Sequence, residues 1–135
     1  MEKKLCTFYD EHMMEQLVCL QNEVYRERGM QFTKDVFQHW FVDNPDGQVI
    51  SCNAFDGEKM IANQSLVPEK LLVSGRIVRC VRSMAVVTHP DYRGKGLLSS
   101  LTNMAIEEAT RLGYDVVYGL ANGNSFPVFI RNCGF

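Results

Sequence analysis

The sequence predicts a single α/β domain over residues 1–135, in which helices flank a mixed, mostly antiparallel sheet. The length of 135 residues suffices for one hydrophobic core and is short for two ordinary domains. Periodicities typical of helices and of strands both occur, and two tight turns join apolar runs in the middle of the chain. The expected order is strand, two helices, a run of antiparallel strands, helix, strand and a last short helix or turn.

A short strand and two helices are expected first. The strand covers residues 5–9, and Asp10 can then cap a helix that Gly29 ends. Thr33 can cap a second short helix, which stops at the turn-forming cluster 43–47. In the first helix the apolar residues recur at three- and four-residue steps, at Met13, Leu17, Leu20 and Val24.

Two hairpins are expected in the middle of the chain. Strands 48–55 and 58–67 meet across Asp56-Gly57, and strands 70–73 and 76–87 meet across Ser74-Gly75. Simple alternation along the last of these strands places Arg79 and Ser83 on one face. The same alternation places four apolar residues on the other face, namely Val78, Cys80, Met84 and Val86.

The C-terminal third predicts helix, strand, and helix or turn. Apolar residues at four-residue steps mark a helix that Gly113 can end in a left-handed conformation. These residues are Leu97, Leu101, Ala105 and Ala109. A short strand at 115–122 and a last helix or turn at 124–135 complete the pattern.

Charge and cysteine usage exclude several classes of protein. The net charge of −2 argues against nucleic acid as the partner, because binding to a phosphate backbone depends on a basic face. No apolar run approaches the ~20 residues that cross a membrane, and the N-terminus lacks the apolar region of a signal peptide. Five scattered cysteines without a C-x-x-C pair favour reduced thiols, a cytoplasmic location and no metal site.

The stretch THPDYRGKGLLSSL, residues 88–101, has the features of an anion site. It follows a strand and opens a helix, whose first N–H groups have no partner within the helix. Gly94 and Gly96 remove side chains that would keep a ligand from those amides, and Arg93 and Lys95 add positive charge. A phosphate group is therefore the expected ligand.

Two common phosphate-binding motifs do not fit this stretch. The Walker pattern G-x-x-x-x-G-K-[ST] is absent from the sequence. The dinucleotide pattern G-x-G-x-x-G begins at Gly94 but meets Ser99 at its last position. It also needs an acidic residue at the end of the next strand, whereas Asp115 lies at that strand's start.

The longer run MAVVTHPDYRGKGLLSSL resembles motif A of the GNAT acetyltransferase superfamily, R/Q-x-x-G-x-G/A. Arg93, Gly96 and Leu98 occupy its three defined positions, and Leu98 departs from the usual glycine or alanine. The ending NSFPVFIRNCGF is similar to the closing N…G-F motif of that superfamily. The resemblance extends over roughly residues 46–135 and implies a GNAT-like fold that lacks the family's C-terminal strands.

This resemblance implies that acetyl-CoA is the acyl donor and that no metal takes part. The pantetheine arm would pair with the strand edge at Val86, Val87 and Thr88. The diphosphate would bind the amides of the glycine loop and the start of the helix, and Asn124 and Ser125 would contact the pantetheine or adenine side. The loop and helix residues implied are Arg93, Gly94, Lys95, Gly96, Leu97, Leu98 and Ser99.

The reaction implied is acetyl transfer to a primary amine of a small molecule or a protein. A backbone N–H near Val86 and Val87 could stabilise the carbonyl oxygen, and holding the reactants together could supply much of the acceleration. The tyrosine that often protonates the thiolate in this family is replaced by Ile130. Tyr118 is a substitute candidate, and the catalytic residues remain unassigned. Residues that could relay a proton are His39, Glu58 and Glu69.

Two other functions stay open from the sequence alone. One is a non-catalytic acyl-CoA-binding or regulatory module, which Ile130 favours. The other is a nucleotide- or phosphosugar-binding domain that uses the same helix end. Because the sequence stops at Phe135, directly after the G-F pair, we also expect either a C-terminally truncated domain or a homodimer that completes the sheet.

Overall fold

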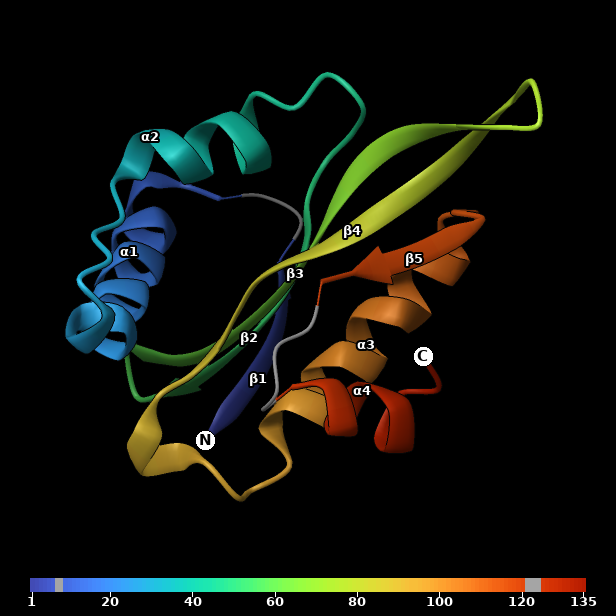
Figure 1. Ribbon diagram of the computed structural model, residues 1–135. Helices are drawn as coiled ribbons and strands as arrows, with labels where there is room; N and C mark the ends of the chain where they lie inside the picture. The colour runs from blue at the N-terminus through green and yellow to red at the C-terminus, as the bar shows by residue number, and fades with distance from the viewer. Residues whose placement is uncertain (7–8, 121–124) are drawn as a thin grey trace.

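Five strands form one sheet in the computed structural model, which describes residues 1–6, 9–120 and 125–135 (Figure 1). Their order in the sheet is that in the chain. β1 to β4 pair antiparallel with their neighbours, and β5 pairs parallel with β4. The mixed, mostly antiparallel sheet expected from the sequence is confirmed. The strands are β1 (Glu2–Cys6), β2 (Ile50–Asp56), β3 (Lys59–Val73), β4 (Arg76–Thr88) and β5 (Val116–Gly119).

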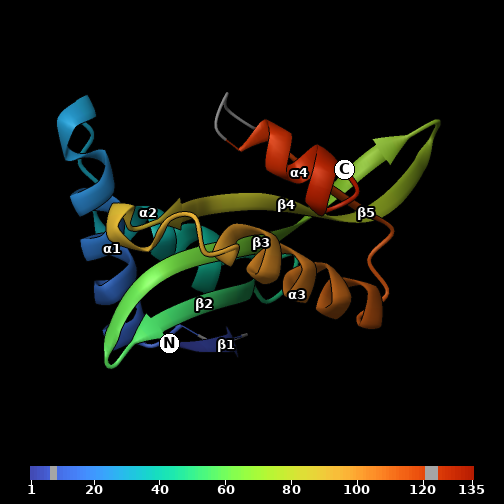
Figure 2. The same ribbon diagram turned by 90° about the horizontal axis from the view of Figure 1, so that it is seen from below.

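Helices cover both faces of the sheet (Figures 1 and 2). On one face lie α1 (Glu11–Tyr25), which continues into a 3-10 turn at Arg26–Arg28, and α2 (Lys34–Phe37), which continues into a π-helical turn at Gln38–Val42. On the other face lie α3 (Leu97–Arg111) and α4 (Phe126–Asn132). A short 3-10 turn at Pro90–Tyr92 follows β4. No helix in the described ranges is long and apolar enough to cross a membrane.

Each face of the sheet has its own core. Leu17 and Leu20 of α1 pack with Phe37, Phe41 and the sheet residues on that side. On the other side α3 buries the small and apolar residues that recur in its sequence, together with strand residues such as Ile50, Ile61 and Val81. The helical residues of this second core are Leu97, Leu101, Ala105 and Ala109, as expected.

The start of α1 follows from its cap. Asp10 has extended backbone dihedrals, and its Oδ1 accepts a hydrogen bond of 2.8 Å from the N–H of Met13. Leu17 and Leu20 are buried as expected, whereas Met13 and Val24 are only partly buried at the edge of the core. Thr33 occupies the equivalent position before α2, but its side chain makes no capping bond with a described residue.

Two strands differ from the sequence-based expectation. β1 begins at Glu2 rather than at residue 5. Its side chains are mostly exposed, so its sequence shows no apolar alternation from which the start of the strand could be predicted. The expected strands 58–67 and 70–73 are one continuous strand, β3, that includes Pro68. Pairing with β2 ends at Leu66, so beyond it β3 is an edge strand on that side, where a residue without an N–H is tolerated.

We expect Asp10→Ala to lower the free energy of unfolding by about 1 kcal/mol, because the N–H of Met13 loses its acceptor. Thr33→Ala is the matched control and should cost clearly less, since that hydroxyl makes no cap bond with the described residues. Urea unfolding followed by circular dichroism measures both. Equal losses would contradict the capping role of Asp10.

Candidate functional site

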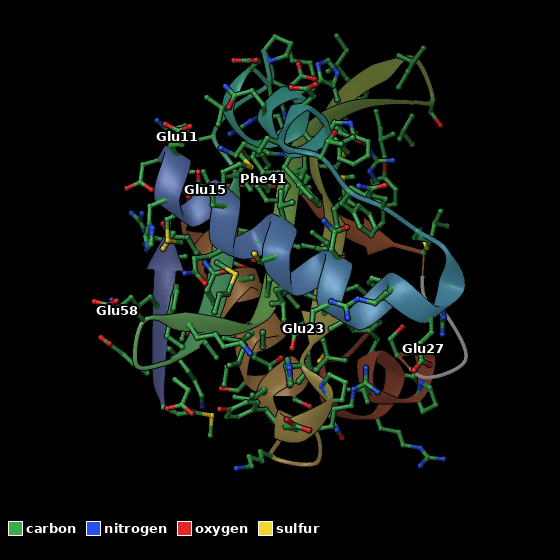
Figure 3. All side chains as sticks on the ribbon, turned by 90° about the vertical axis from the view of Figure 1, so that its left-hand side faces the viewer. Glu11, Glu15, Glu23, Glu27, Phe41 and Glu58 are labelled. Carbon is green, nitrogen blue, oxygen red and sulfur yellow. The ribbon has the colours of Figure 1, made fainter. Side chains whose placement is uncertain are left out.

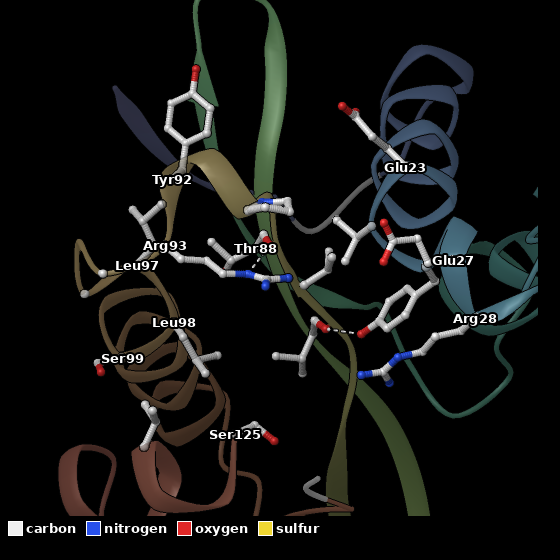
Figure 4. Close-up of a pocket in the computed structure, with 18 of the residues that line it drawn as sticks. Glu23, Glu27, Arg28, Thr88, Tyr92, Arg93, Leu97, Leu98, Ser99 and Ser125 are labelled. Atoms are coloured by element: carbon white, nitrogen blue, oxygen red, sulfur yellow. Dashed lines mark hydrogen bonds between the residues drawn. The ribbon is translucent and has the colours of Figure 1, made fainter. Parts of the chain in front are cut away.

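A cleft of about 930 Å³ opens where β4 and β5 part (Figure 4). β5 pairs with β4 only from Cys80 to Ser83, so the last residues of β4 extend beyond their neighbour. The cleft lies between this end of β4, the following loop, the start of α3, and the end of α1. Residues of α4 and the preceding Ser125 also line it.

A bulge in β4 lies at the point where the two strands part. The register against β3 shifts between Asn63 and Ser65, and Ala85 adopts a left-handed conformation with φ +54°. This conformation costs a residue with a Cβ about 1–2 kcal/mol. The bulge also breaks the expected alternation, because Met84 and Val87 both pack against the core on the α1 side. Met84 and Val87 pair with Ser65 and Asn63, which share a face of β3. Val86 therefore lies on the other face of β4, and the prediction that it shares a face with Met84 is wrong.

The loop after β4 is anchored through His89. Its N–H donates to the carbonyl of Ile61 at 2.8 Å, and its Nδ1 accepts from the N–H of Asp91 at 3.2 Å. A ring whose Nδ1 accepts carries its proton on Nε2, which therefore donates to Glu23 of α1 at 2.8 Å. This hydrogen bond holds the pKa of the Glu23 carboxyl below its usual value. The loop is thus joined to α1 across the mouth of the cleft.

The glycine loop leaves the start of α3 open. Gly94 and Gly96 have φ of +78° and +71°, and no described atom lies within 4 Å of a Cβ placed on either. Gly96 precedes the helix, and the first helical hydrogen bond runs from Ser100 N to Gly96 O at 3.0 Å. The N–H groups of Leu97, Leu98 and Ser99 therefore come before the bonded ladder, as donors for an anion.

Arg93 brings positive charge to this end of the cleft. Its Nε donates to the carbonyl of Thr88 at 3.3 Å, and its guanidinium extends into the cleft in Figure 4. Lys95 behaves differently, because its Nζ lies 5.6 Å from the ring centre of Tyr92 and it is not among the lining residues described. Arg93 can therefore neutralise a bound phosphate directly.

Most of the residues expected to bind the cofactor line this one cleft. Lys95 does not, and Asn124 lies outside the described residues. Leu98 lies at the start of α3, with its side chain toward the cleft in Figure 4. The lining residues that the sequence analysis named are Val86, Val87, Thr88, Arg93, Gly94, Gly96, Leu97, Leu98, Ser99 and Ser125.

The opposite wall of the cleft runs from Glu23 to Arg28, and none of its residues was identified from the sequence. The hydroxyl of Tyr25 donates to the carbonyl of Val86 at 3.4 Å, and the guanidinium of Arg28 lies 5.7 Å from the ring centre of Tyr25. Figure 3 shows Glu23 and Glu27 along this end of α1, and Figure 4 places Glu27 and Arg28 across the cleft from Arg93. The sequence there shows only a run of charged residues at the end of a helix, and this run matches no motif.

The candidate proton-transfer residues lie apart from the cleft lining. Tyr118 of β5 donates to the carboxylate of Glu69, and Arg82 Nε lies 3.0 Å from that carboxylate. The bond to Glu69 raises the pKa of Tyr118 to about 12. His39 and Glu58 are exposed on the α2 side and in the β2–β3 turn. None of these residues, and not Ile130 of α4, is among the described residues that line the cleft.

Described His, Cys, Asp and Glu side chains form no group of three that could hold a metal ion. On the α3 side of the cleft the donors are backbone N–H groups and the guanidinium of Arg93, which suit an anionic ligand rather than a cation. The chemistry of this donor set therefore fits a diphosphate.

Comparison with known proteins identifies relatives of the sequence and of the fold. The family model for an acetyltransferase (GNAT) domain matches residues 8–135. The fold is similar to that of a predicted acetyltransferase with acetyl-CoA from Clostridium acetobutylicum, with a TM-score of 0.78 and 15% sequence identity over 99% of this chain and 88% of that chain. No curated protein matches the sequence.

Two further similar structures carry names that include an acceptor. One is a ribosomal-protein-alanine N-acetyltransferase from Brucella melitensis biovar Abortus 2308, with a TM-score of 0.70 and 14% identity over 97% of this chain and 90% of that chain. The other is an aminoglycoside acetyltransferase from an uncultured soil metagenomic sample, in complex with sisomicin. Its TM-score is 0.69, with 12% identity over 96% of this chain and 82% of that chain. At these identities the likeness is one of fold.

Proposed function

Because the chain belongs to the GNAT acetyltransferase family, we propose that it transfers the acetyl group of acetyl-CoA to a primary amine. The observation that carries this proposal is the open end of β4 beside the unblocked start of α3. An extended pantetheine arm needs a free strand edge, and a diphosphate needs free amides at a helix start. Both lie in one cleft.

The cofactor's diphosphate would bind the N–H groups of Leu97, Leu98 and Ser99, with Arg93 at its rim. The pantetheine arm would run along Val86 to Thr88, where β5 no longer covers β4. Ser125, which lines the same cleft, would lie beside it. The bound cofactor supplies an activated acetyl group whose carbonyl oxygen gains negative charge as the amine attacks.

The chain's own part in the reaction would be to position the reactants and stabilise charge. The backbone N–H group of Val86, directly after the bulge and on the edge that faces away from β3, would donate to the carbonyl oxygen. The wall at Glu23 to Arg28 would hold the acceptor, because the α3 side is taken by the cofactor. Proximity of amine and thioester supplies much of the rate, so a side-chain acid is not required.

The acceptor is proposed to be an amine of a small molecule or a protein. The names of two similar structures include an aminoglycoside and a ribosomal-protein alanine, and both are acetylated at an amine. The wall facing the acceptor combines two carboxylates, Glu23 and Glu27, with two guanidinium groups, Arg26 and Arg28. Carboxylates attract a protonated amine before it loses its proton to become the nucleophile.

A screen of primary amines with acetyl-CoA, read out as free thiol, tests the proposed reaction. We expect thiol release that depends on the amine and saturates with it. Binding of acetyl-CoA without amine-dependent thiol release across polyamines, aminoglycosides, amino acids and peptide N-termini would instead identify an acyl-CoA-binding module. Calorimetry that finds ATP bound more tightly than acetyl-CoA would reject both.

Gly96→Ala should weaken coenzyme A binding by about tenfold or more, because a Cβ and a shifted backbone disturb charge-assisted amide contacts, which contribute about 1.5–3 kcal/mol each. Gly75→Ala is the matched control. Gly75 has φ +77° and open space for a Cβ, but it lies in the β3–β4 turn. Both variants should lose similar stability in urea, and only Gly96→Ala should lose affinity in calorimetry. Equal affinities would argue against the diphosphate cradle.

Tyr118→Phe should leave kcat within about threefold of the wild type, since a general acid contributes about a hundredfold or more. The physical reason is that its proton is held by Glu69 and its pKa is raised to about 12. Steady-state kinetics with the best amine of the screen measures the change. A hundredfold loss with cofactor binding intact would make Tyr118 the acid.

A further inference from the structure

The left-handed backbone of Ala85 is held by two buried side-chain amides. Its carbonyl accepts hydrogen bonds from Asn63 Nδ2 at 2.8 Å and from Gln21 Nε2 at 3.1 Å. Asn63 and Gln21 are only 1% and 2% exposed. A residue with a Cβ persists in this conformation only where its surroundings determine it, and these two bonds, one from β3 and one from α1, do so.

A buried hydroxyl network fixes the orientation of the Asn63 amide. Its Oδ1 accepts from the hydroxyl of Tyr9 at 3.0 Å and from Ser51 Oγ at 2.9 Å. Burial raises the pKa of Tyr9, so its phenol remains a donor. Because the oxygen of the amide is held by two hydroxyl groups, its nitrogen faces Ala85. The network therefore points a donor at the bulge.

The buried amide and hydroxyl groups near Ala85 are not needed to form a core, because apolar side chains would fill the same space. Polar side chains buried in a core are costly unless they are hydrogen-bonded, and a satisfied network specifies one arrangement of the backbone. Here the two amides reach the carbonyl at the single position of β4 where the strand deviates. We therefore interpret the network as the support of the bulge.

The bulge determines how the following residues face the cleft. After Ala85 the alternation is shifted, so that Val87 shares the core face with Met84 and Val86 lies on the other face of the strand. Both valines line the cleft. Tyr25, one turn beyond Gln21 on α1, donates to the carbonyl of Val86. The direction of the Val86 N–H group thus depends on the backbone of Ala85.

We propose that Gln21 and Asn63 are positioning residues that clamp the Ala85 carbonyl and thereby aim the backbone N–H group of Val86 at the acetyl thioester. This inference rests on the proposed function for its catalytic consequence. Neither side chain touches the reactants, because both lie beneath the sheet surface in the α1-side core. Their effect on the rate is through the backbone alone.

Gln21→Met tests the clamp, with Gln64→Met as the matched control. Methionine removes the amide at similar volume in both. Gln64 is fully buried next to Asn63, but it donates to Thr102 and accepts from Ser83 on the opposite face. We expect similar losses of stability, and a fall in kcat of about tenfold or more for Gln21→Met only. The dissociation constant of coenzyme A should stay within about twofold, because the diphosphate cradle is unchanged.

Ala85→Gly in the Gln21→Met background separates positioning from stability. Glycine adopts positive φ without support, so the double variant should recover kcat to within about threefold of the wild type. The same glycine should not improve Gln64→Met. Equal kcat losses in the two methionine variants, or no recovery of kcat when Ala85→Gly is added, would overturn the clamp.

Carbon chemical shifts of Ala85 give a readout that needs no activity. They should report the left-handed conformation in the wild type and its loss in Gln21→Met. If no amine is turned over but this shift pattern is found, the proposed function fails and the clamp survives. An unchanged Ala85 conformation in Gln21→Met refutes the clamp. If Gln21→Met does not fold, Asn63→Asp replaces it as the test variant, and Asn53→Asp is the matched control. Asn53 belongs to the same hydrogen-bond network but does not bond to Ala85.

Discussion

The parting of β4 from β5 is the constraint on which the site depends. A parallel pair that stayed bonded along its length would leave no free edge at the end of β4. Pairing instead stops at Ser83, and the left-handed turn of Ala85 two residues later redirects the strand. The free edge then leads into the glycine loop, whose geometry leaves the start of α3 open. Strand edge and helix end thereby lie in one cleft, which offers backbone donors at both places.

Polar residues in the core supply the hydrogen bonds that hold the bulge in place. Ser51, Asn53, Asn63 and Ser65 occupy alternate positions of β2 and β3, and together with Tyr9 they form a buried polar group on one face of the sheet, at positions that apolar residues would ordinarily occupy. Every one of them has a partner, which is the condition under which burial of such groups is tolerated. The opposite face has a conventional apolar core under α3. The two faces of one sheet thus serve different purposes: α3 supplies stability and a helix end, and the α1 side shapes the strand.

Local signals in the sequence were enough for the order of elements along the chain, the Asp10 cap and the glycine loop. Asp10, Gly94 and Gly96 each act through their own backbone or a neighbour's, so their pattern can be recognised without a structure. The bulge could not be recognised, because MAVV is regular as a strand and the amides that hold Ala85 come from positions 21 and 63. The α1 wall was missed for the same reason, because its residues line the cleft only through the packing of α1 against the sheet. Lys95 was expected in the cleft from its neighbours in sequence, but it lies over Tyr92.

α1 is joined to β4 and to the loop after it at three successive points. Gln21 bonds Ala85, Glu23 bonds His89, and Tyr25 bonds Val86. This end of α1 is therefore held to β4 and to the loop after it along one side of the cleft. The wall from Glu23 to Arg28 thereby keeps a fixed position relative to the strand, so the shape of the cleft on that side is set by the fold before any ligand binds.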